Sequence, residues 1–322
     1  MSVRGALVAL ALGGTVTGLF GCAQQHAAPT PTPPSSVPTA IPPYDGSLPP
    51  AQAVLALVPL RATTLRVVDL TEVRRQLGLP ELTSGSSAAD RADFRSRAEA
   101  GAALLDRGVL TPDDARLRAT YGFGADDVAW EAHFAGGGGA GWVLALGTQV
   151  DMTDVRRAAA DGVGALRGAT VDPADHLVSW HAAGPGEPVW GSDPTWARLV
   201  PDPGEAFVVR RGCIGHLPAA PTAGARLQPL LRPLTGFAVT FGDHVATVRV
   251  DPGRTDLFAR VRLAGAWSVG RTTFGQVFRH GVADPSGGRI GYDVPRPAEA
   301  ATLVRRGLLP FGVCGPAGPG AP

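Results

Sequence analysis

Apolar and polar side chains alternate along residues 128–134, and this pattern constrains the fold more than any other feature of the sequence. The apolar positions are Val128, Trp130, Ala132 and Phe134. A period of two predicts a strand that is buried on one face. The glycines at 136–139 predict a turn, and the apolar run at 142–150 predicts the second strand of a hairpin.

The elements around this hairpin predict the first of two α+β domains. Over residues 60–183 their order is β-α, a helical insertion and β-β-α-β, which is the ferredoxin-like split βαβ plan. Val68–Arg75 also matches Val150–Arg157, either through common origin or because two strand-to-helix junctions are similar by chance. The predicted elements are a strand at 64–70, helices at 71–77, 87–106, from 111 and at 151–160, and a strand at 176–181.

The second half predicts a smaller α+β unit. A globular region of this length usually exceeds a single core, so we expect two domains, at residues 51–195 and 196–322. The elements predicted in the second are a strand at 206–211, a hairpin of 237–241 with 245–250, a strand at 289–294, a helix at 297–306 and a strand at 311–314.

The first 22 residues have the pattern of an export signal. Arg4 precedes an apolar stretch, residues 6–20, that is shorter than the roughly 20 residues of a membrane span. The stretch leads into Leu19-Phe20-Gly21-Cys22, which resembles the lipobox of bacterial lipoproteins. The resemblance implies that residues 1–21 are a cleaved signal peptide and that Cys22 carries a lipid anchor. An ordinary cleaved signal with a free Cys22 is the alternative.

Residues 22–50 are expected to be a tether. They follow the lipobox cysteine with nine prolines between residues 23 and 50. A segment of this composition cannot bury a core and favours the extended polyproline II conformation. The folded region should therefore stand away from the membrane surface.

Missing residue types exclude several functions. The chain has no lysine and no asparagine, as expected of a GC-rich genome such as that of an actinobacterium. A Schiff-base lysine and a Walker A phosphate site are therefore excluded. The net charge is +1, and the Arg-Arg pairs are scattered along the chain, so no basic patch predicts a nucleic-acid partner.

Two cysteines remain after Cys22, at Cys213 and Cys314. An even pair in an exported chain predicts a disulfide, because the compartment is oxidising. Two buried free thiols are the alternative.

Few residues form a pattern typical of a catalytic, metal-binding or phosphate-binding site. Glu131 and His133 share one face of the predicted strand, as an acid–base pair or as solvated side chains. His176 and His181 fall on opposite strand faces, which disfavours a shared metal. The glycines at 136–139 join two strands and so do not open a helix as a phosphate loop does. We expect no catalytic, cofactor or metal site.

Three tryptophans lie where the two predicted domains meet. Trp180, Trp190 and Trp196 surround a Gly- and Pro-rich stretch. Aromatic side chains at such a junction line ligand clefts or pack the domains together. They are the candidate contacts for a ligand or partner.

The sequence therefore predicts a lipid-anchored protein on the extracytoplasmic face of the cell membrane. We expect a non-catalytic binding or scaffolding role, with the membrane and an envelope protein or small ligand as partners. The alternatives are a solute-binding lipoprotein of an importer and an envelope hydrolase whose active site follows no known motif.

Replacing Cys22 tests the anchor. Cys22→Ala should move the protein from the membrane fraction to the soluble fraction, because acyl chains on this sulfur contribute about 0.8 kcal/mol per buried methylene. Fractionation at high salt measures the shift. A variant that stays with the membrane contradicts the lipobox assignment.

Overall fold

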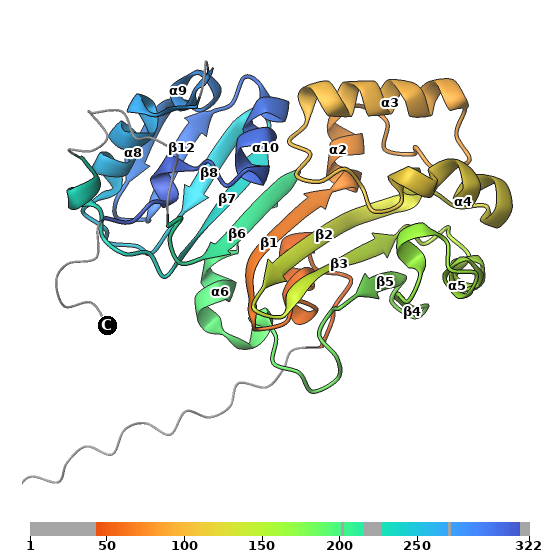
Figure 1. The fold of residues 1–322 in the computed structure, drawn as a ribbon. Coiled ribbons are helices and arrows are strands. Elements are labelled where there is room, and N and C mark those ends of the chain that lie inside the picture. Colours follow the sequence, from red (N-terminus) through yellow and green to blue (C-terminus); the bar gives the residue numbers. More distant parts are fainter. Residues whose placement is uncertain (1–42, 201–202, 216–226, 270–271, 316–322) are drawn as a thin grey trace, which may run out of the picture. The chain divides into compact units, whose positions relative to one another are not determined.

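The computed structural model describes residues 43–200, 203–215, 227–269 and 272–315. Cys22, the predicted signal peptide and most of the predicted tether lie outside these residues. Within them, ten strands form one antiparallel sheet in the order β11-β12-β8-β7-β6-β1-β2-β3-β5-β4 (Figure 1). The strands are β1 (Ala62–Asp69), β2 (Val128–Gly136), β3 (Gly139–Leu146), β4 (Thr170–Asp172), β5 (Leu177–Trp180), β6 (Ala206–Arg211), β7 (Gly236–Gly242), β8 (Val245–Arg249), β11 (Arg279–Asp284) and β12 (Arg289–Asp293).

Helices and a second, two-stranded sheet complete the described fold. The small sheet pairs β9 (Ser268–Val269) with β10 (Thr272–Thr273). The α-helices are α1 (Pro50–Ala53), α2 (Leu70–Gln76), α3 (Ala88–Gly101), α4 (Asp114–Tyr121), α5 (Met152–Ala160), α6 (Pro194–Leu199), α8 (Leu257–Ala266), α9 (Phe274–Val277) and α10 (Pro297–Arg305).

The hairpin predicted from the alternating pattern is confirmed. β2 pairs with β3 through a two-residue turn, with Phe134 opposite Gly141 and Gly136 opposite Gly139. Gly139 has a φ of +102°, which a residue with a side chain rarely adopts. The turn therefore needs glycine there.

The large sheet consists of two halves with the same strand order. Outward from its centre the first half runs β1-β2-β3-β5-β4, and the second half runs β6-β7-β8-β12-β11. The halves join where β1 pairs antiparallel with β6, with Leu65 opposite Val209. This repeat of strand order is not the sequence match of Val68–Arg75 with Val150–Arg157. The structural feature that those two segments share is a capping aspartate, Asp69 for α2 and Asp151 for α5.

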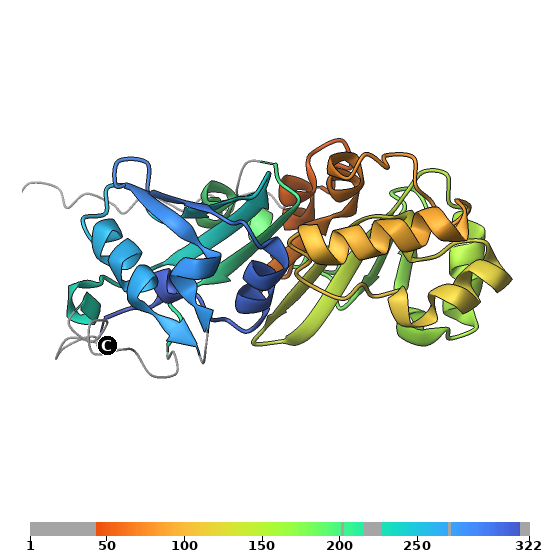
Figure 2. The ribbon, with the colours of Figure 1, turned by 90° about the horizontal axis from the view of Figure 1, so that it is seen from above.

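Helices cover the two faces of the sheet unequally. We call the face that carries α2–α5 and α8–α10 the upper face and the other the lower face (Figure 1). The lower face of the first half packs against α1, α6 and the 3-10 turns η1 (Val54–Ala56) and η5 (Trp190–Ser192). On the upper face α3 crosses the strands of the first half, and α10 of the second half packs beside it (Figure 2).

The α+β class is confirmed, but the ferredoxin-like plan is not. A split βαβ unit needs its first and third strands parallel, whereas β1 lies directly beside β2 and antiparallel to it. The predicted boundary at 195/196 falls inside α6, between the two halves, yet the sheet continues across it and the described residues form one compact unit. The predicted last strand, 311–314, is instead a 3-10 turn, η7 (Pro310–Gly312), followed by a single bridge from Val313 to Ile214.

The predicted disulfide is confirmed. Cys213 and Cys314 are bonded, with their Cα atoms 5.6 Å apart and a separation of 101 in sequence. The bond ties the end of β6 to the segment after α10. Closing a loop of this length restricts the unfolded chain and contributes up to about 4–5 kcal/mol.

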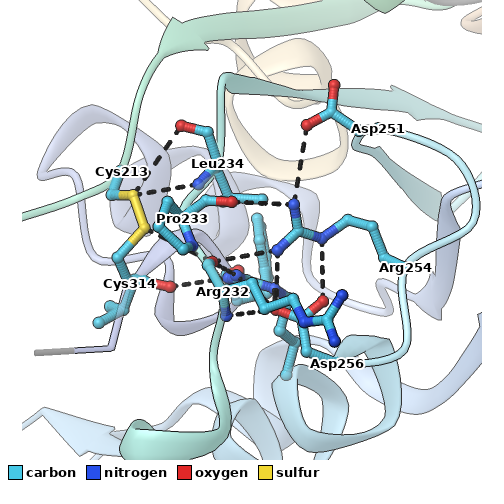
Figure 3. The surroundings of a disulfide bond; sticks show 11 residues. Cys213, Arg232, Pro233, Leu234, Asp251, Arg254, Asp256 and Cys314 are labelled. Atoms are coloured by element: carbon cyan, nitrogen blue, oxygen red, sulfur yellow. Dashed lines mark hydrogen bonds and ion pairs between the residues drawn. A yellow bond between two sulfur atoms is a disulfide. The ribbon is translucent and has the colours of Figure 1, made fainter. Parts of the chain in front are cut away.

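A buried ionic cluster stabilises the same region (Figure 3). Asp256 accepts hydrogen bonds from Arg254 and Arg260 and from the backbone N–H of Arg232 at 2.8 Å. Arg260 is fully buried and donates to the carbonyl oxygens of Phe311 and Val313. Each buried charge therefore has partners, as burial requires.

Burial by itself would raise the pKa of the Asp256 carboxyl. The hydrogen bonds from Arg254 and Arg232 and the charges of Arg260 and Arg254 outweigh it and lower the pKa to about 2. The shift from the unfolded value is equivalent to about 2 kcal/mol. This contribution is fully present above pH ~4 and is lost as the pH falls through about 2, because the unfolded chain takes up the proton first.

Asp256→Asn should lower the free energy of unfolding by about 3–5 kcal/mol near neutral pH, because Arg260 stays buried without its counter-charge. The difference from the wild type should shrink as the pH falls from 4 to 2. Urea titrations at several pH values measure it. Asp251→Asn is the control, since Asp251 lies 3.7 Å from Arg254 at the surface, and it should change stability by at most about 1 kcal/mol. A pH-independent Asp256→Asn difference contradicts the prediction.

Candidate functional site

A cavity of about 540 Å³ lies on the upper face, between α3, α10, the loop 102–111 and strands β1 and β2. Cavities of this volume are typical of sites for small molecules. Its apolar lining includes Val68, Phe94, Ala98, Leu104, Leu110 and Val128. The walls come from both halves of the chain, because α10 belongs to the second half and the other elements to the first.

The sequence of α3 creates the space. Ser87 caps the helix by accepting a hydrogen bond from the N–H of Asp90. Phe94 and Ala98 follow on one face, four residues apart, and Ala102 lies just past the end of the helix. The two alanines are buried and line the cavity. Their small side chains leave room that leucine would fill.

The floor of the cavity carries a buried carboxylate. Glu131 on β2 is 4% exposed and accepts a hydrogen bond from the N–H of Val109 at 2.9 Å. Its other oxygen is hydrogen-bonded to His133 Nε2. Glu131 therefore fixes the loop 102–111 against the sheet.

The structure changes the interpretation of the Glu131 and His133 pair. They share a strand face, as predicted, but Glu131 is buried beneath the loop 102–111 and His133 is half-buried, so they are not two solvated side chains. Burial lowers the pKa of His133, whereas the hydrogen bond to Glu131 and the charges of Glu131 and Asp106 outweigh it and raise the pKa overall. The contact with Glu131 therefore stabilises the protonated form of His133 relative to its neutral form.

A second ion pair lies next to the Glu131–His133 pair. Arg66 on β1 lies opposite His133 in the sheet and binds Asp106 through two hydrogen bonds of 2.9 Å. Asp106 belongs to the loop 102–111 and lines the cavity. Bidentate pairing of this kind fixes both side chains.

Another wall carries a buried carboxylate with poor hydrogen bonding. Asp126 is 3% exposed, and its Oδ2 lies 3.5 Å from Arg91 Nε and 3.6 Å from Arg95 Nη1. Neither Asp126 Oδ2 nor Arg91 Nε has a hydrogen-bond partner within the described residues. Burial raises the pKa of Asp126, Arg95 opposes the rise and Asp114 adds to it.

The three predicted tryptophans do not line this cavity. Trp190 is fully buried on the lower face, where its Nε1–H donates to the carbonyl of Ala62 at 3.2 Å. Trp196 packs against it at 5.2 Å between ring centres, and Arg211 lies over both rings. Trp180 on β5 stacks on His181 instead. Because Trp190 and Trp196 share a core with β1 and β6, the geometry favours their packing role over contact with a ligand.

The remaining sequence candidates are two histidines beside β5. His176 and His181 flank β5 with positive φ values of 52° and 57°. Across the described ranges, no group of three or more His, Cys, Asp or Glu side chains could hold a metal ion. In that same part of the chain no helix is long and apolar enough to cross a membrane.

No family model and no curated protein matches the sequence, and no solved structure matches the fold. The function is therefore inferred from the cavity. No sequence motif marks it, because its lining comes from separate segments between residues 68 and 131 and from 298–305. The sequence feature that pointed to the cavity was Glu131, a carboxylate on a strand of alternating apolar and polar residues.

Proposed function

We propose that this chain is a lipid-anchored binding protein on the extracytoplasmic face of the cell membrane, and that its cavity holds a small molecule with a substantial apolar part. The observation that carries the proposal is the cavity of about 540 Å³ between α3 and α10. Apolar walls with a few placed polar groups are the usual composition of a small-molecule site.

A binding role without catalysis fits the chemistry of the floor. Both oxygens of Glu131 already have partners, in His133 and the N–H of Val109. Asp106 is likewise held by Arg66 at two positions. These carboxylates shape the site and hold its loop. A general base instead needs a free oxygen within reach of the proton that it removes.

A solute-binding lipoprotein of an importer would use the same cavity, and Cys22 and the tether suit that role equally. In both proposals the ligand enters the site between the two halves. They differ in the fate of the bound ligand, which is delivered to an importer in one case and retained at the membrane in the other.

Filling the cavity tests the proposal. Ala98→Trp should reduce the affinity for the neutral probe N-phenyl-naphthylamine by about tenfold or more, since the indole would occupy the space. Fluorescence titration of the mature protein measures it. Ala100→Trp is the matched control, because Ala100 is exposed on the same helix, and it should bind as the wild type does.

Thr302→Trp, on the α10 wall, provides a second variant if Ala98→Trp does not fold. Circular dichroism and thermal melts establish that each variant is native. A folded cavity variant that still binds the probe as tightly as the wild type contradicts the proposed function.

A further inference from the structure

Some charged side chains around the cavity form ion pairs with one another, and others do not. Glu131 is paired with His133, and Asp106 with Arg66. Asp126 lies within ion-pair distance of Arg91 and Arg95. The three acidic groups of the interior are thus compensated by the protein itself and leave little negative charge for a cationic ligand.

Two arginines of the lining have no carboxylate partner within the described residues. They are Arg107, on the loop 102–111, and Arg305, in the last turn of α10, and both are exposed. Arg305 donates to the carbonyl of Leu104 at 2.6 Å and to the hydroxyl of Thr302 at 2.9 Å. These bonds hold its guanidinium between α10 and the loop that carries Arg107.

One lining acid is also without a described partner, namely Glu99, which is exposed on α3. The uncompensated side chains are therefore two cations and one anion. An exposed arginine beside an apolar cavity binds carboxylate or phosphate oxygens well, because its planar guanidinium offers paired donors.

We propose that the cavity takes an amphipathic anion, whose apolar chain lies between α3 and α10 and whose carboxylate or phosphate head is bound by Arg305 and Arg107. This inference rests on the proposed function and names the class of ligand. Fatty acids and single-chain lipid phosphates share this chemistry.

Paired probes test the head group. Dansyl-undecanoate should bind the mature protein about tenfold or more tightly than its uncharged methyl ester. Arg305→Gln and Arg107→Gln should weaken binding of the acid and leave binding of the ester unchanged, and Glu99→Gln should strengthen binding of the acid. Arg306→Gln is the control for Arg305→Gln, since Arg306 is exposed, adjacent in sequence and absent from the lining. Arg116→Gln is the control for Arg107→Gln, because Arg116 is exposed on α4.

Competition separates the two head groups. Dodecanoate and dodecyl phosphate should each displace dansyl-undecanoate, and the stronger competitor identifies the head, whereas dodecanol should compete weakly. Equal binding of acid and ester, both blocked by Ala98→Trp, overturns the anionic head and leaves the proposed function standing. Binding of neither probe, or binding of both that Ala98→Trp does not reduce, overturns the proposed function and this inference together.

Discussion

The antiparallel pairing of β1 with β6 is the interaction on which the rest of the structure depends. It runs from Thr64 opposite Arg210 to Val68 opposite Ala206. With β2 on its other side, β1 is paired along both edges, so the two halves share one sheet. Because the sheet is continuous, α10 of the second half packs on α3 of the first, and the cavity forms between them.

Because the two halves share one strand order, the elements that differ between them indicate what forms the cavity. In the first half the β1–β2 connection contains α2, α3 and α4, which cover the upper face. In the second half the connection from β6 to β7, residues 212–235, carries Cys213 of the disulfide and the 3-10 turn η6 (Gln228–Leu230). There Phe237 and Phe241 of β7 fill the upper face with aromatic rings, whereas β2 presents Glu131 and His133. The helices inserted between β1 and β2 thus help to form a cavity with a polar floor over the first half.

The local sequence pattern predicted many of the helices and strands, because these patterns depend on residues that are close together in sequence. Alternation predicted β2, and in the structure a hydroxyl caps α3 and a carboxylate caps α5, each within a few residues of the helix that it starts. The pairing of β1 with β6 could not be predicted in this way, since its register depends on residues far apart in sequence. The same holds for the cavity, which needs α10 beside α3. Trp190 was prominent in the sequence as a candidate contact, yet a tryptophan serves a core as well as a ligand site.

Hydrogen–deuterium exchange on the mature protein, with and without dansyl-undecanoate, tests most directly whether the junction of the halves is the binding site. Ligand between α3 and α10 should slow exchange in peptides covering 94–111 and 298–305 together, because these segments face one cavity. Peptides of the lower face around Trp190 should be unchanged. Slowed exchange around Trp190 alone, or in only one of the two cavity segments, would contradict a site shared by the two halves.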